Sequence, residues 1–356
     1  MSKKIFFIIP DLRCGGAEKV FINLANFYSD QFDVRLILLE KKGELLNQLN
    51  NNIKVVSLET KRIRNSFFKL IPILKDVKNS YIISAMWPLN CFVMLASLFL
   101  SKSNKFFVTE HVNLSKSIGI DFKSKKLMIY LSISLTYFLS EKVICVSNGV
   151  AKDIQKYYLF GKDKFMTIYN PIINKVSEIN RTDNLKINIL SVGTLKMQKD
   201  HLTLLKAFSL LENIDLYHLN IVGDGPLMLD LKNYSRELGL LKHVTFHGFQ
   251  NNVDKFYKSN DIFILSSIYE GFGNVLVEAL SFGMQIISTN CQSGPSEILD
   301  NGKYGILVPI KKPEKIRNAI TKIMSSKFNP KDLKARSNDF KIDTIAKKYL
   351  NLMQAS

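Results

Sequence analysis

The chain has 356 residues, of which 46% are hydrophobic and 22% charged, and this composition is typical of a soluble globular protein. No low-complexity segment and no fixed-period repeat is present, which excludes a disordered chain and a repeat protein. The length predicts two domains of about 170 to 180 residues each.

The formal net charge of +18 is unevenly distributed along the chain. Residues 1–170 contain 25 Lys and Arg against 13 Asp and Glu, whereas the remaining residues contain 24 against 18. The N-terminal half therefore carries most of the excess charge. Such a surface is expected to attract anionic lipid, nucleic acid or a polyphosphate ligand.

Strands and helices are predicted to alternate through the first half of the chain. A strand over Lys4–Asp11 is followed by a glycine turn and a helix over Ala17–Tyr28. This alternation predicts a doubly wound parallel sheet, in which ligands bind at the carboxyl ends of the strands. The later strands of this half are expected at Asp33–Glu40, Ile53–Leu58, Tyr81–Trp87, Lys105–His111, Lys142–Ser147 and Phe165–Tyr169.

Two uncharged runs in this half raise the question of a membrane segment. Tyr81–Ser101 is long enough to span a bilayer, but Pro88 and Asn90 interrupt it near the middle, so a buried strand followed by a helix is favoured. Leu127–Ser140 follows a lysine-rich stretch and is too short to span. It is predicted to be either a core helix or a helix that lies in a membrane interface.

The second half repeats the alternation after a polar, non-periodic stretch. The predicted domains are an N-terminal Rossmann-like domain at 1–171, a linker at 172–186 and a C-terminal Rossmann-like domain at 187–340. A basic amphipathic helix in 341–356 is expected to pack back toward the N-terminal domain. The predicted fold class is therefore α/β, with two doubly wound parallel-sheet domains facing across a cleft.

The cysteines give no sign of a metal site or of secretion. Cys14, Cys91, Cys145 and Cys291 lie far apart and form no C-x-x-C pair, so neither a metal knuckle nor a disulfide framework is indicated. A reducing cytosol is the expected compartment. The apolar stretch Ile5–Pro10 is too short for a signal peptide.

Several familiar ligand motifs are absent from the sequence. Gly223-Asp224-Gly225 and Gly271-Phe272-Gly273 do not complete the dinucleotide fingerprint, so a nicotinamide enzyme is not favoured. No P-loop, no G-x-S-x-G elbow and no D-x-D clamp for a metal-bridged diphosphate occur. The histidines lack zinc-ligand spacing. No metal and no other cofactor is therefore expected.

The segment from Glu270 to Leu280 contains the most informative pattern. A buried strand precedes it, a glycine loop follows Glu270, and residues with helical spacing then include Glu278. The N–H groups of such a loop and of the helix N-terminus can bind an anion, and a carboxylate on each side can accept hydroxyl groups. The pattern suits a nucleotide-sugar. An ordinary βα unit with solvated glutamates is the alternative.

Two single residues also fit an anion or sugar site. Lys199 follows the first strand of the second half, where it either neutralises a diphosphate or is a solvated lysine at a helix start. His111 ends a buried strand, where it is either a ligand contact or a core histidine bound to the backbone.

The order of these motifs is more specific than any one of them. They are Gly15-Gly16-Ala17-Glu18-Lys19, Glu110-His111, Ser147-Asn148, Tyr169-Asn170-Pro171, Gly193 to Asp200, Val222-Gly223-Asp224-Gly225-Pro226, Phe246-His247-Gly248-Phe249 and E-x7-E from Glu270 to Glu278. This set resembles the retaining glycosyltransferases of family 4, which have the GT-B fold, almost from end to end. Residues 288–299 are in addition similar to bacterial hexosaminyltransferases that extend lipid-linked glycans, including α-1,4-N-acetylgalactosaminyltransferases.

The resemblance implies roles for individual residues. His111 and Glu270 would act at the donor sugar, Glu278 would bind the ribose hydroxyls, and Lys199 would neutralise the leaving phosphate. The other implied donor-binding residues, with Phe249 at the base, are Gly15, Gly16, Gly193, Thr194, Gly223, Phe249, Phe272, Gly273, Asn274, Val275 and Leu276.

One position departs from the family pattern. Thr194 stands where family members commonly have arginine, so the diphosphate would depend on Lys199 and the loop amides, unless Lys196 substitutes. The resemblance implies a metal-independent front-face reaction, in which the departing phosphate accepts the proton of the acceptor hydroxyl.

The expected activity is transfer of a hexose or N-acetylhexosamine from a UDP-sugar to a glycan acceptor, expected to be lipid-linked, in bacterial surface polysaccharide or glycoprotein-glycan biosynthesis. The positive charge fits a cytoplasmic enzyme in peripheral contact with the anionic inner membrane. A UDP-sugar epimerase with the same fold is the nearest alternative. A nucleic-acid-binding protein is motivated by charge alone and lacks any reader motif.

Overall fold

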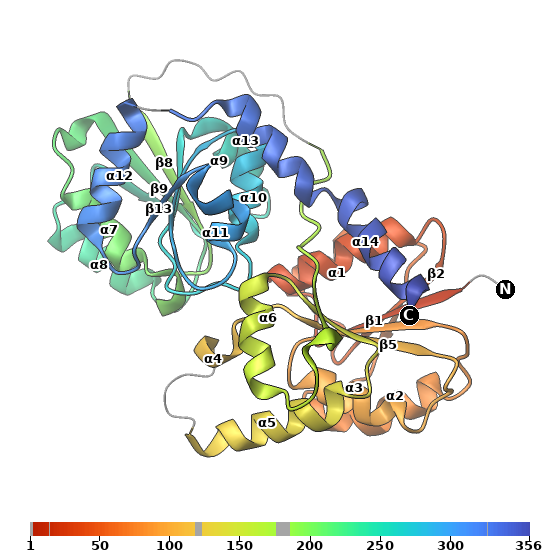
Figure 1. The fold of residues 1–356 in the computed structure, drawn as a ribbon. Helices are drawn as coiled ribbons and strands as arrows, with labels where there is room; N and C mark the ends of the chain where they lie inside the picture. The colour runs from red at the N-terminus through yellow and green to blue at the C-terminus, as the bar shows by residue number, and fades with distance from the viewer. Residues whose placement is uncertain (1–2, 14, 118–122, 176–185, 326) are drawn as a thin grey trace. The chain divides into compact units, whose positions relative to one another are not determined.

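The chain folds into two compact units. The computed structural model describes residues 3–13, 15–117, 123–175, 186–325 and 327–356, with the backbone alone at residues 123–125. Unit 1 comprises Met1–Ile172 together with Phe340–Ser356, and unit 2 comprises Ile173–Asp339 (Figure 1). Of the predicted linker 172–186, residues 176–185 lie outside the described residues.

Unit 1 contains a seven-stranded sheet in the order β3-β2-β1-β4-β5-β6-β7, and every pair of neighbours is parallel. Its interior strands are almost completely buried, since helices cover both faces of the sheet, and this explains their uninterrupted apolar sequences. The strands are β1 (Lys4–Ile9), β2 (Asp33–Leu38), β3 (Lys54–Ser57), β4 (Tyr81–Ala85), β5 (Lys105–Glu110), β6 (Lys142–Cys145) and β7 (Phe165–Thr167).

The helices of unit 1 form two layers, with α1 and α14 on one face of the sheet and α2, α3 and α5 on the other (Figure 1). The Tyr28 hydroxyl of α1 donates a 2.6 Å hydrogen bond to the Ala346 carbonyl of α14, so the C-terminal segment is part of unit 1. The helices are α1 (Gly16–Tyr28), α2 (Ser66–Leu74), α3 (Leu89–Ser97), α4 (Leu114–Ser117), α5 (Lys123–Tyr137), α6 (Asn148–Ile154) and α14 (Ile342–Ala355).

Unit 2 contains a second parallel sheet, in the order β10-β9-β8-β11-β12-β13. The strands are β8 (Ile187–Val192), β9 (Tyr217–Val222), β10 (Val244–Phe246), β11 (Ile262–Leu265), β12 (Gln285–Thr289) and β13 (Ile306–Val308). The helices are α7 (His201–Ser209), α8 (Met228–Glu237), α9 (Asp254–Ser259), α10 (Asn274–Ser281), α11 (Pro295–Ile298), α12 (Pro313–Ser325) and α13 (Pro330–Ser337).

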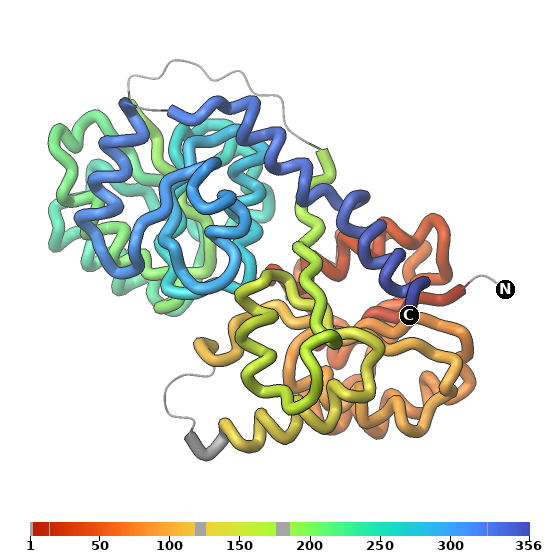
Figure 2. Tube along the Cα trace, in the orientation of Figure 1, coloured from red at the N-terminus to blue at the C-terminus, as the bar shows by residue number. Residues whose placement is uncertain are grey.

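The chain passes between the units twice, once after β7 and once after α13 (Figure 2). Where it returns to unit 1, the Ile172 amide donates a 3.0 Å hydrogen bond to the Phe340 carbonyl. The Tyr169 ring packs on the Phe340 ring at 5.7 Å, and the Asn23 side chain donates to the Pro171 carbonyl. The Tyr169-Asn170-Pro171 motif therefore lies where the segment that follows β7 meets the segment that returns to unit 1 after α13.

The interpretation of Tyr81–Ser101 as a strand and a helix is confirmed, since β4 and α3 occupy this run. The strand ends at Ala85, two residues before the predicted end, because Met86 adopts a positive φ of 66° and turns the chain. No helix in the described ranges is long and apolar enough to cross a membrane.

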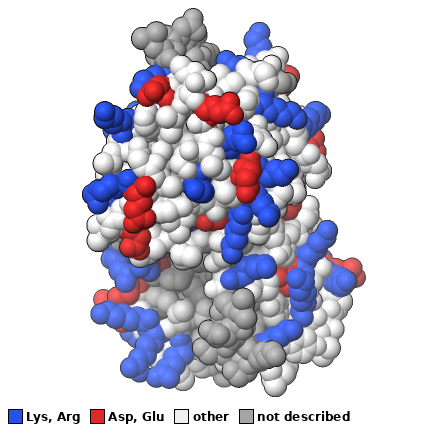
Figure 3. Space-filling view, turned by 90° about the vertical axis from the view of Figure 1, so that its left-hand side faces the viewer, with Lys and Arg blue, Asp and Glu red and all other residues white. Residues whose placement is uncertain are grey.

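The excess positive charge is dispersed over the surface that faces the viewer in Figure 3. There, Lys and Arg side chains lie among Asp and Glu side chains and uncharged surface, rather than lining one continuous basic groove. A charge arrangement of this kind gives weak support to nucleic-acid binding, which uses a basic stripe or patch.

The hydrogen bond between α1 and α14 predicts a measurable contribution to the stability of unit 1. Tyr28→Phe keeps the buried ring but removes the donor to Ala346, so the free energy of unfolding is expected to fall by about 1–2 kcal/mol. Urea unfolding followed by the fluorescence of Trp87, the one tryptophan of the chain, measures this loss. Tyr130→Phe on α5 is the control, and an equal loss there would contradict the assignment.

Candidate active site

Two loops lie side by side at the carboxyl edge of the unit 2 sheet. The strand order reverses direction between β8 and β11, which are neighbours in the sheet although two strands separate them in the chain. Ligands of doubly wound sheets bind at such a switch point. The loops at this point are 193–200 after β8 and 266–273 after β11, and they contain the predicted residues Lys199 and Glu270.

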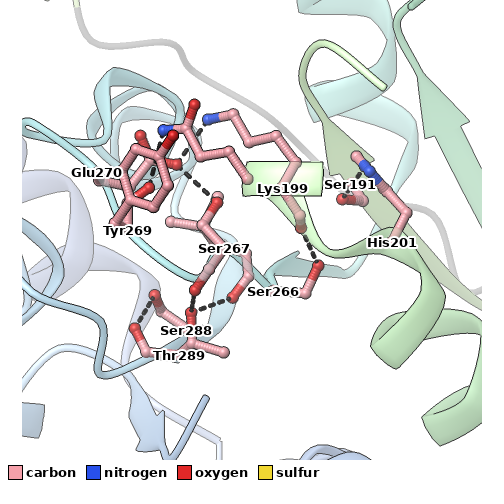
Figure 4. A network of polar contacts seen from close by, with 11 residues as sticks. Ser191, Lys199, His201, Ser266, Ser267, Tyr269, Glu270, Ser288 and Thr289 are labelled. Atoms are coloured by element: carbon pink, nitrogen blue, oxygen red, sulfur yellow. Dashed lines mark hydrogen bonds and ion pairs between the residues drawn. The ribbon is translucent and has the colours of Figure 1, made fainter. Parts of the chain in front are cut away.

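Hydrogen bonds cross-link these two loops (Figure 4). The Ser266 hydroxyl donates to the Lys199 carbonyl at 2.7 Å. The Gln198 side chain donates to the Tyr269 carbonyl at 2.8 Å, and the Ile268 amide donates to the Gln198 carbonyl at 2.8 Å. Three hydrogen bonds therefore join the two loops, and Lys199 and Glu270 are brought together by backbone as well as side-chain contacts.

Lys199 and Glu270 form an ion pair with 2.6 Å between Nζ and Oε1. Their side chains are only 14% and 8% exposed, so water screens the pair weakly. Ser267 also donates to Oε1 of Glu270 at 2.6 Å, and Thr289 fixes the Ser267 carbonyl at 2.6 Å. Glu270 is thus held by a cation and a hydroxyl, in an orientation set by β11 and β12 (Figure 4).

Glycines at the start of α10 are required by the backbone. Gly273 precedes the helix with a φ of 101°, a conformation that strains any other residue. A Cβ on Gly294 would lie 1.7 Å from the Phe272 carbonyl oxygen, so the loop before α11 presses directly on the glycine loop. The segment between β11 and α10 therefore has a fixed shape, and it aims the N-terminus of α10 at the carboxyl edge of the sheet.

Glu278 lies in the second turn of α10 and accepts a hydrogen bond from the Tyr257 hydroxyl at 2.7 Å. Tyr257 is fully buried on α9, and its ring stacks on Phe282 at 5.2 Å. Burial and the adjacent Glu278 carboxylate raise the pKa of Tyr257 well above its usual value, so the hydroxyl keeps its proton. Tyr257 therefore orients Glu278, a partner that the sequence pattern alone did not reveal.

The loops after β8, β9 and β10 pack successively along the same edge. A Cβ on Gly223 would lie 2.0 Å from the Gly193 carbonyl oxygen, and the Gly223 amide donates to the Gly248 carbonyl at 2.9 Å. Phe249 follows Gly248 with about half of its side chain exposed. Thr194 is exposed at the same edge.

Lys196 is the residue proposed to replace the missing arginine at Thr194, and it lies within electrostatic range of the ion pair. Partial desolvation and the positive charge of Lys199 lower the pKa of Lys196, while Glu270 opposes this shift. The loop after β8 therefore presents two lysines near Glu270.

In unit 1, the glycine loop after β1 is shaped by charged side chains. Asp11 is buried and accepts hydrogen bonds from the Arg13 amide at 3.1 Å and from Arg13 Nε at 2.9 Å. A Cβ on Gly15 would lie 2.1 Å from the Glu18 carboxylate, so Gly15 leaves room for Glu18 at the start of α1. Burial raises the pKa of Glu18. Gly16 is exposed, and Cys14 lies outside the described residues.

His111 follows β5 as a buried, neutral side chain. Burial lowers the pKa of His111 to about 3. Its Nε2 lies 3.0 Å from the Thr109 hydroxyl, and that hydroxyl donates its own hydrogen to the Ser84 carbonyl at 2.9 Å. His111 therefore donates through Nε2–H, and Nδ1 retains its lone pair. Nδ1 is buried and has no hydrogen-bond partner among the described residues, so its lone pair can accept one further hydrogen bond.

Glu110 lies next to His111 in a completely buried polar cluster. Its Oε1 accepts from the Tyr137 hydroxyl of α5, from Asn90 Nδ2 of α3 at 2.8 Å and from the Trp87 amide at 3.0 Å. Burial raises the pKa of Glu110 to about 7, although these donors oppose the shift. Glu110 therefore joins β5 to two helices and to the loop after β4.

The structure gathers most of the predicted unit 2 residues at one sheet edge. Lys199, Glu270 and the residues from Phe272 to Leu276 belong to the two cross-linked loops and α10, while Gly193 and Gly223 pack together beside them. Gly15, Gly16 and His111 belong to unit 1. Sequence reasoning missed Tyr257, Ser267 and Tyr137, because single tyrosines and serines inside apolar segments carry no motif.

No cluster in the described ranges has the composition of a metal centre. No three His, Cys, Asp or Glu side chains among the described residues gather to hold a metal ion. Cys91, Cys145 and Cys291 are buried thiols. His201 is buried 3.5 Å from the Ser191 hydroxyl, and burial lowers its pKa to about 3, which fits a structural histidine.

Comparison with known proteins places both units in recognised sequence families. The family model described as Glycosyl transferases group 1 matches residues 173–340, and the model described as Glycosyltransferase Family 4 matches residues 14–173. The two matches together run almost from end to end, and their junction coincides with the boundary between the units at Ile172 and Ile173.

Similar proteins are known at the levels of sequence and of structure. The chain is 27% identical over 368 residues to a Campylobacter jejuni GalNAc-α-(1→4)-GalNAc-α-(1→3)-diNAcBac-PP-undecaprenol α-1,4-N-acetyl-D-galactosaminyltransferase, with 98% of each chain covered. It is 27% identical over 325 residues to a second C. jejuni enzyme, N-acetylgalactosamine-N,N'-diacetylbacillosaminyl-diphospho-undecaprenol 4-alpha-N-acetylgalactosaminyltransferase, with 86% of each covered. HepE of Anabaena, solved in complex with UDP and glucose, superposes with a TM-score of 0.84 over the whole of both chains at 17% identity.

The buried position of Glu110 predicts a pH-dependent stability of unit 1. Because the pKa of Glu110 is about 7 in the folded chain and near its usual 4.5 when unfolded, the folded state binds the proton more tightly, and stability falls as pH rises from about 4.5 to about 7. Glu110→Gln is expected to abolish this pH dependence. The change in the free energy of unfolding that is lost is on the order of 3 kcal/mol over this pH range.

Urea unfolding at several pH values, followed by Trp87 fluorescence, compares the two slopes. Glu141→Gln, an exposed glutamate just after α5, is the control and should keep the slope of the unmodified chain. Equal slopes for the unmodified chain and Glu110→Gln would show that Glu110 does not titrate in this range.

Proposed function

Since the chain belongs to the family 4 and group 1 glycosyltransferases, which have the GT-B fold, we propose that it transfers a hexose or N-acetylhexosamine from a UDP-sugar to a lipid-linked glycan with retention of configuration. The reaction proposed is independent of a metal ion. The product would serve bacterial surface polysaccharide or glycoprotein-glycan biosynthesis.

The ion pair between Lys199 and Glu270 is the observation that carries this proposal. It sets a cation and a carboxylate together at the switch point of the unit 2 sheet, where the N-terminus of α10 also points. A cation and a helix N-terminus suit a diphosphate, and a carboxylate suits sugar hydroxyls. Glu278, oriented by Tyr257, adds a second carboxylate for the ribose hydroxyls.

The proposed chemistry is a front-face displacement at the anomeric carbon. The bond between this carbon and the β-phosphate oxygen breaks, and its electron pair stays on the phosphate. The acceptor oxygen forms a bond from the same face, and its proton passes to the departing phosphate. Lys199 and the amides at the start of α10 stabilise the negative charge that develops on this phosphate. His111 accepts a hydrogen bond at Nδ1 from a hydroxyl of the donor sugar.

The proposed acceptor class rests on the relatives. Two similar C. jejuni enzymes are named for acceptors that carry undecaprenol through a diphosphate. A sugar on such a lipid remains at a membrane surface, and the charge of +18 favours contact between this chain and anionic headgroups. We therefore place the protein in the cytoplasm, at the cytoplasmic face of the inner membrane.

A panel of UDP-sugars, incubated with and without an extract of lipid-pyrophosphate glycans, tests the reaction class. Release of UDP that depends on the acceptor extract, together with transfer of label from one donor, is the expected result. The appearance of a second UDP-sugar without acceptor and without UDP release would contradict transfer and favour an epimerase.

The hydrogen bond from Tyr257 to Glu278 predicts a change in donor affinity alone. Tyr257→Phe keeps the buried ring but removes the hydrogen bond that this hydroxyl donates to Glu278, so the Kd for UDP is expected to rise about 5- to 10-fold, with little change in kcat. Calorimetric titration with UDP and with its 2′,3′-dideoxy analogue measures the effect. A loss confined to UDP supports the ribose contact, whereas an equal loss for both ligands would show that Tyr257 acts on the loop in general.

The roles at the sugar predict larger losses of turnover. Glu270→Ala and His111→Ala should each lower kcat by more than about 100-fold, on the order of 3 kcal/mol, whereas Glu278→Ala and Lys199→Ala should chiefly weaken donor binding. Glu237→Ala, an exposed glutamate at the end of α8, is the control. Near-normal turnover of both Glu270→Ala and His111→Ala would refute these assignments.

A further inference from the structure

Helix α5 presents an apolar stripe to solvent. Its exposed side chains are Leu127 (64%), Met128 (51%), Leu131 (47%), Leu135 (67%) and Phe138 just beyond the helix (56%). At about 100° per residue, these five positions fall within an arc of about 100°, so they form one continuous stripe. The buried side of the helix is also apolar, and it includes Ile129 and Ile133. A surface helix normally exposes mostly polar residues, whereas after Lys126 the exposed residues of α5 are apolar.

Neighbouring elements add further exposed apolar side chains. α3 lies against α5 in the same layer of unit 1, and α2 lies against α3 (Figure 1). The Phe138 ring contacts the ring of Phe160 at 5.2 Å, and the Phe67 ring contacts that of Phe99 at 5.7 Å. The exposed apolar residues beyond α5 are Phe68, Leu95, Leu98, Phe99, Leu159 and Phe160. We call these residues and the α5 stripe the apolar face of unit 1.

The charged residues around the apolar face indicate which kind of partner it binds. Residues 77–109 and 122–140, which contain α3 and α5, include no Asp or Glu, so the charged side chains among them are lysines. Lys126 is exposed on α5, and the Lys164 ammonium lies 5.6 Å from the centre of the Phe138 ring. A second copy of this chain would bring the same lysines against each other. An anionic surface that also accepts apolar side chains is complementary to the face.

The length of α5 indicates how the helix would lie in a bilayer. α5 has 15 residues and is about 22 Å long, which is shorter than the hydrocarbon core of about 30 Å. The helix can therefore lie in the interface with its stripe among the acyl chains and Lys126 at the headgroups. We propose that the apolar face of unit 1 docks on an anionic phospholipid bilayer, with α5 as its centre.

Docking would bring the bilayer close to the candidate site of unit 1. The buried side of α5 supplies Tyr137, whose hydroxyl donates to Glu110, and Glu110 precedes His111. A helix held in the headgroup layer is thus tied to the strand end that carries His111. This link deepens the proposed lipid-linked acceptor, although docking itself can be measured without any transfer reaction.

Vesicle flotation of the full chain tests the proposal. The unmodified chain should float with phosphatidylcholine vesicles that contain phosphatidylglycerol and much less with phosphatidylcholine alone, and added salt should weaken its binding. Leu131→Glu combined with Leu135→Glu should lower partitioning by at least about tenfold, because both side chains leave the apolar stripe. Leu229→Glu on α8, an equally exposed leucine of unit 2, is the matched control and should bind as the unmodified chain.

Three results would overturn the proposal. They are flotation of the double variant at the unmodified level, an equal loss for Leu229→Glu, and a dimer in light scattering that the double variant breaks, which would identify a second copy as the occupant. If the glutamates impair folding, judged by circular dichroism, the milder Leu131→Ser with Leu135→Ser is used under the same criteria. UDP binding without vesicles should be unchanged in these variants, so failure of docking is distinguishable from failure of the proposed transfer.

Discussion

The ion pair between Lys199 and Glu270 is the constraint on which the candidate site of unit 2 depends. Two oppositely charged groups this close and this buried stabilise each other only while both are present, and removal of one partner typically costs about 3–5 kcal/mol. The pair joins the loops after β8 and β11, which the fold places together at the switch point of the sheet. It therefore serves as both a structural link and the charged centre of the site.

For the proposed diphosphate ligand, the same pair holds Lys199 in place before any ligand arrives. Glu270 and the surrounding hydrogen bonds hold the ammonium group in a defined position, so little side-chain entropy remains to be lost on binding. The glycine contacts also hold the loop backbone in position, because Gly223 and Gly294 approach neighbouring backbone too closely for any side chain. Fixed amides and a fixed cation are what electrostatic stabilisation of a departing phosphate requires.

The candidate residues of unit 1 differ from this charged pair in their ionisation. His111 is neutral, and the pKa of Glu110 is near neutrality.

The sequence was sufficient to predict the strand–helix alternation, the parallel sheets and the place of the loops, because buried parallel strands have uninterrupted apolar sequences and glycines interrupt them only at turns. The positions of Lys199 and Glu270 after strand ends, and of Glu278 on the following helix, could be predicted from their motifs. The residues that contact them could not be predicted from the sequence. Tyr257 reaches Glu278 across 21 positions and Lys199 reaches Glu270 across 71, so these contacts follow from packing that no local pattern encodes. The same holds for α5, where lysines and leucines indicated either a core helix or an interfacial helix, and only side-chain exposure separates the two faces.

We propose that the loops around Lys199 and Glu270, with the start of α10, hold the nucleotide diphosphate without a metal ion. Hydrogen–deuterium exchange with and without UDP, in the presence of EDTA, measures this directly. Slower exchange is expected in residues 193–200 and 268–278, with no comparable change in α7, α8 or α12. UDP binding that protects other segments of unit 2 while leaving these two unchanged, or that vanishes in EDTA and returns with Mg²⁺, would contradict it.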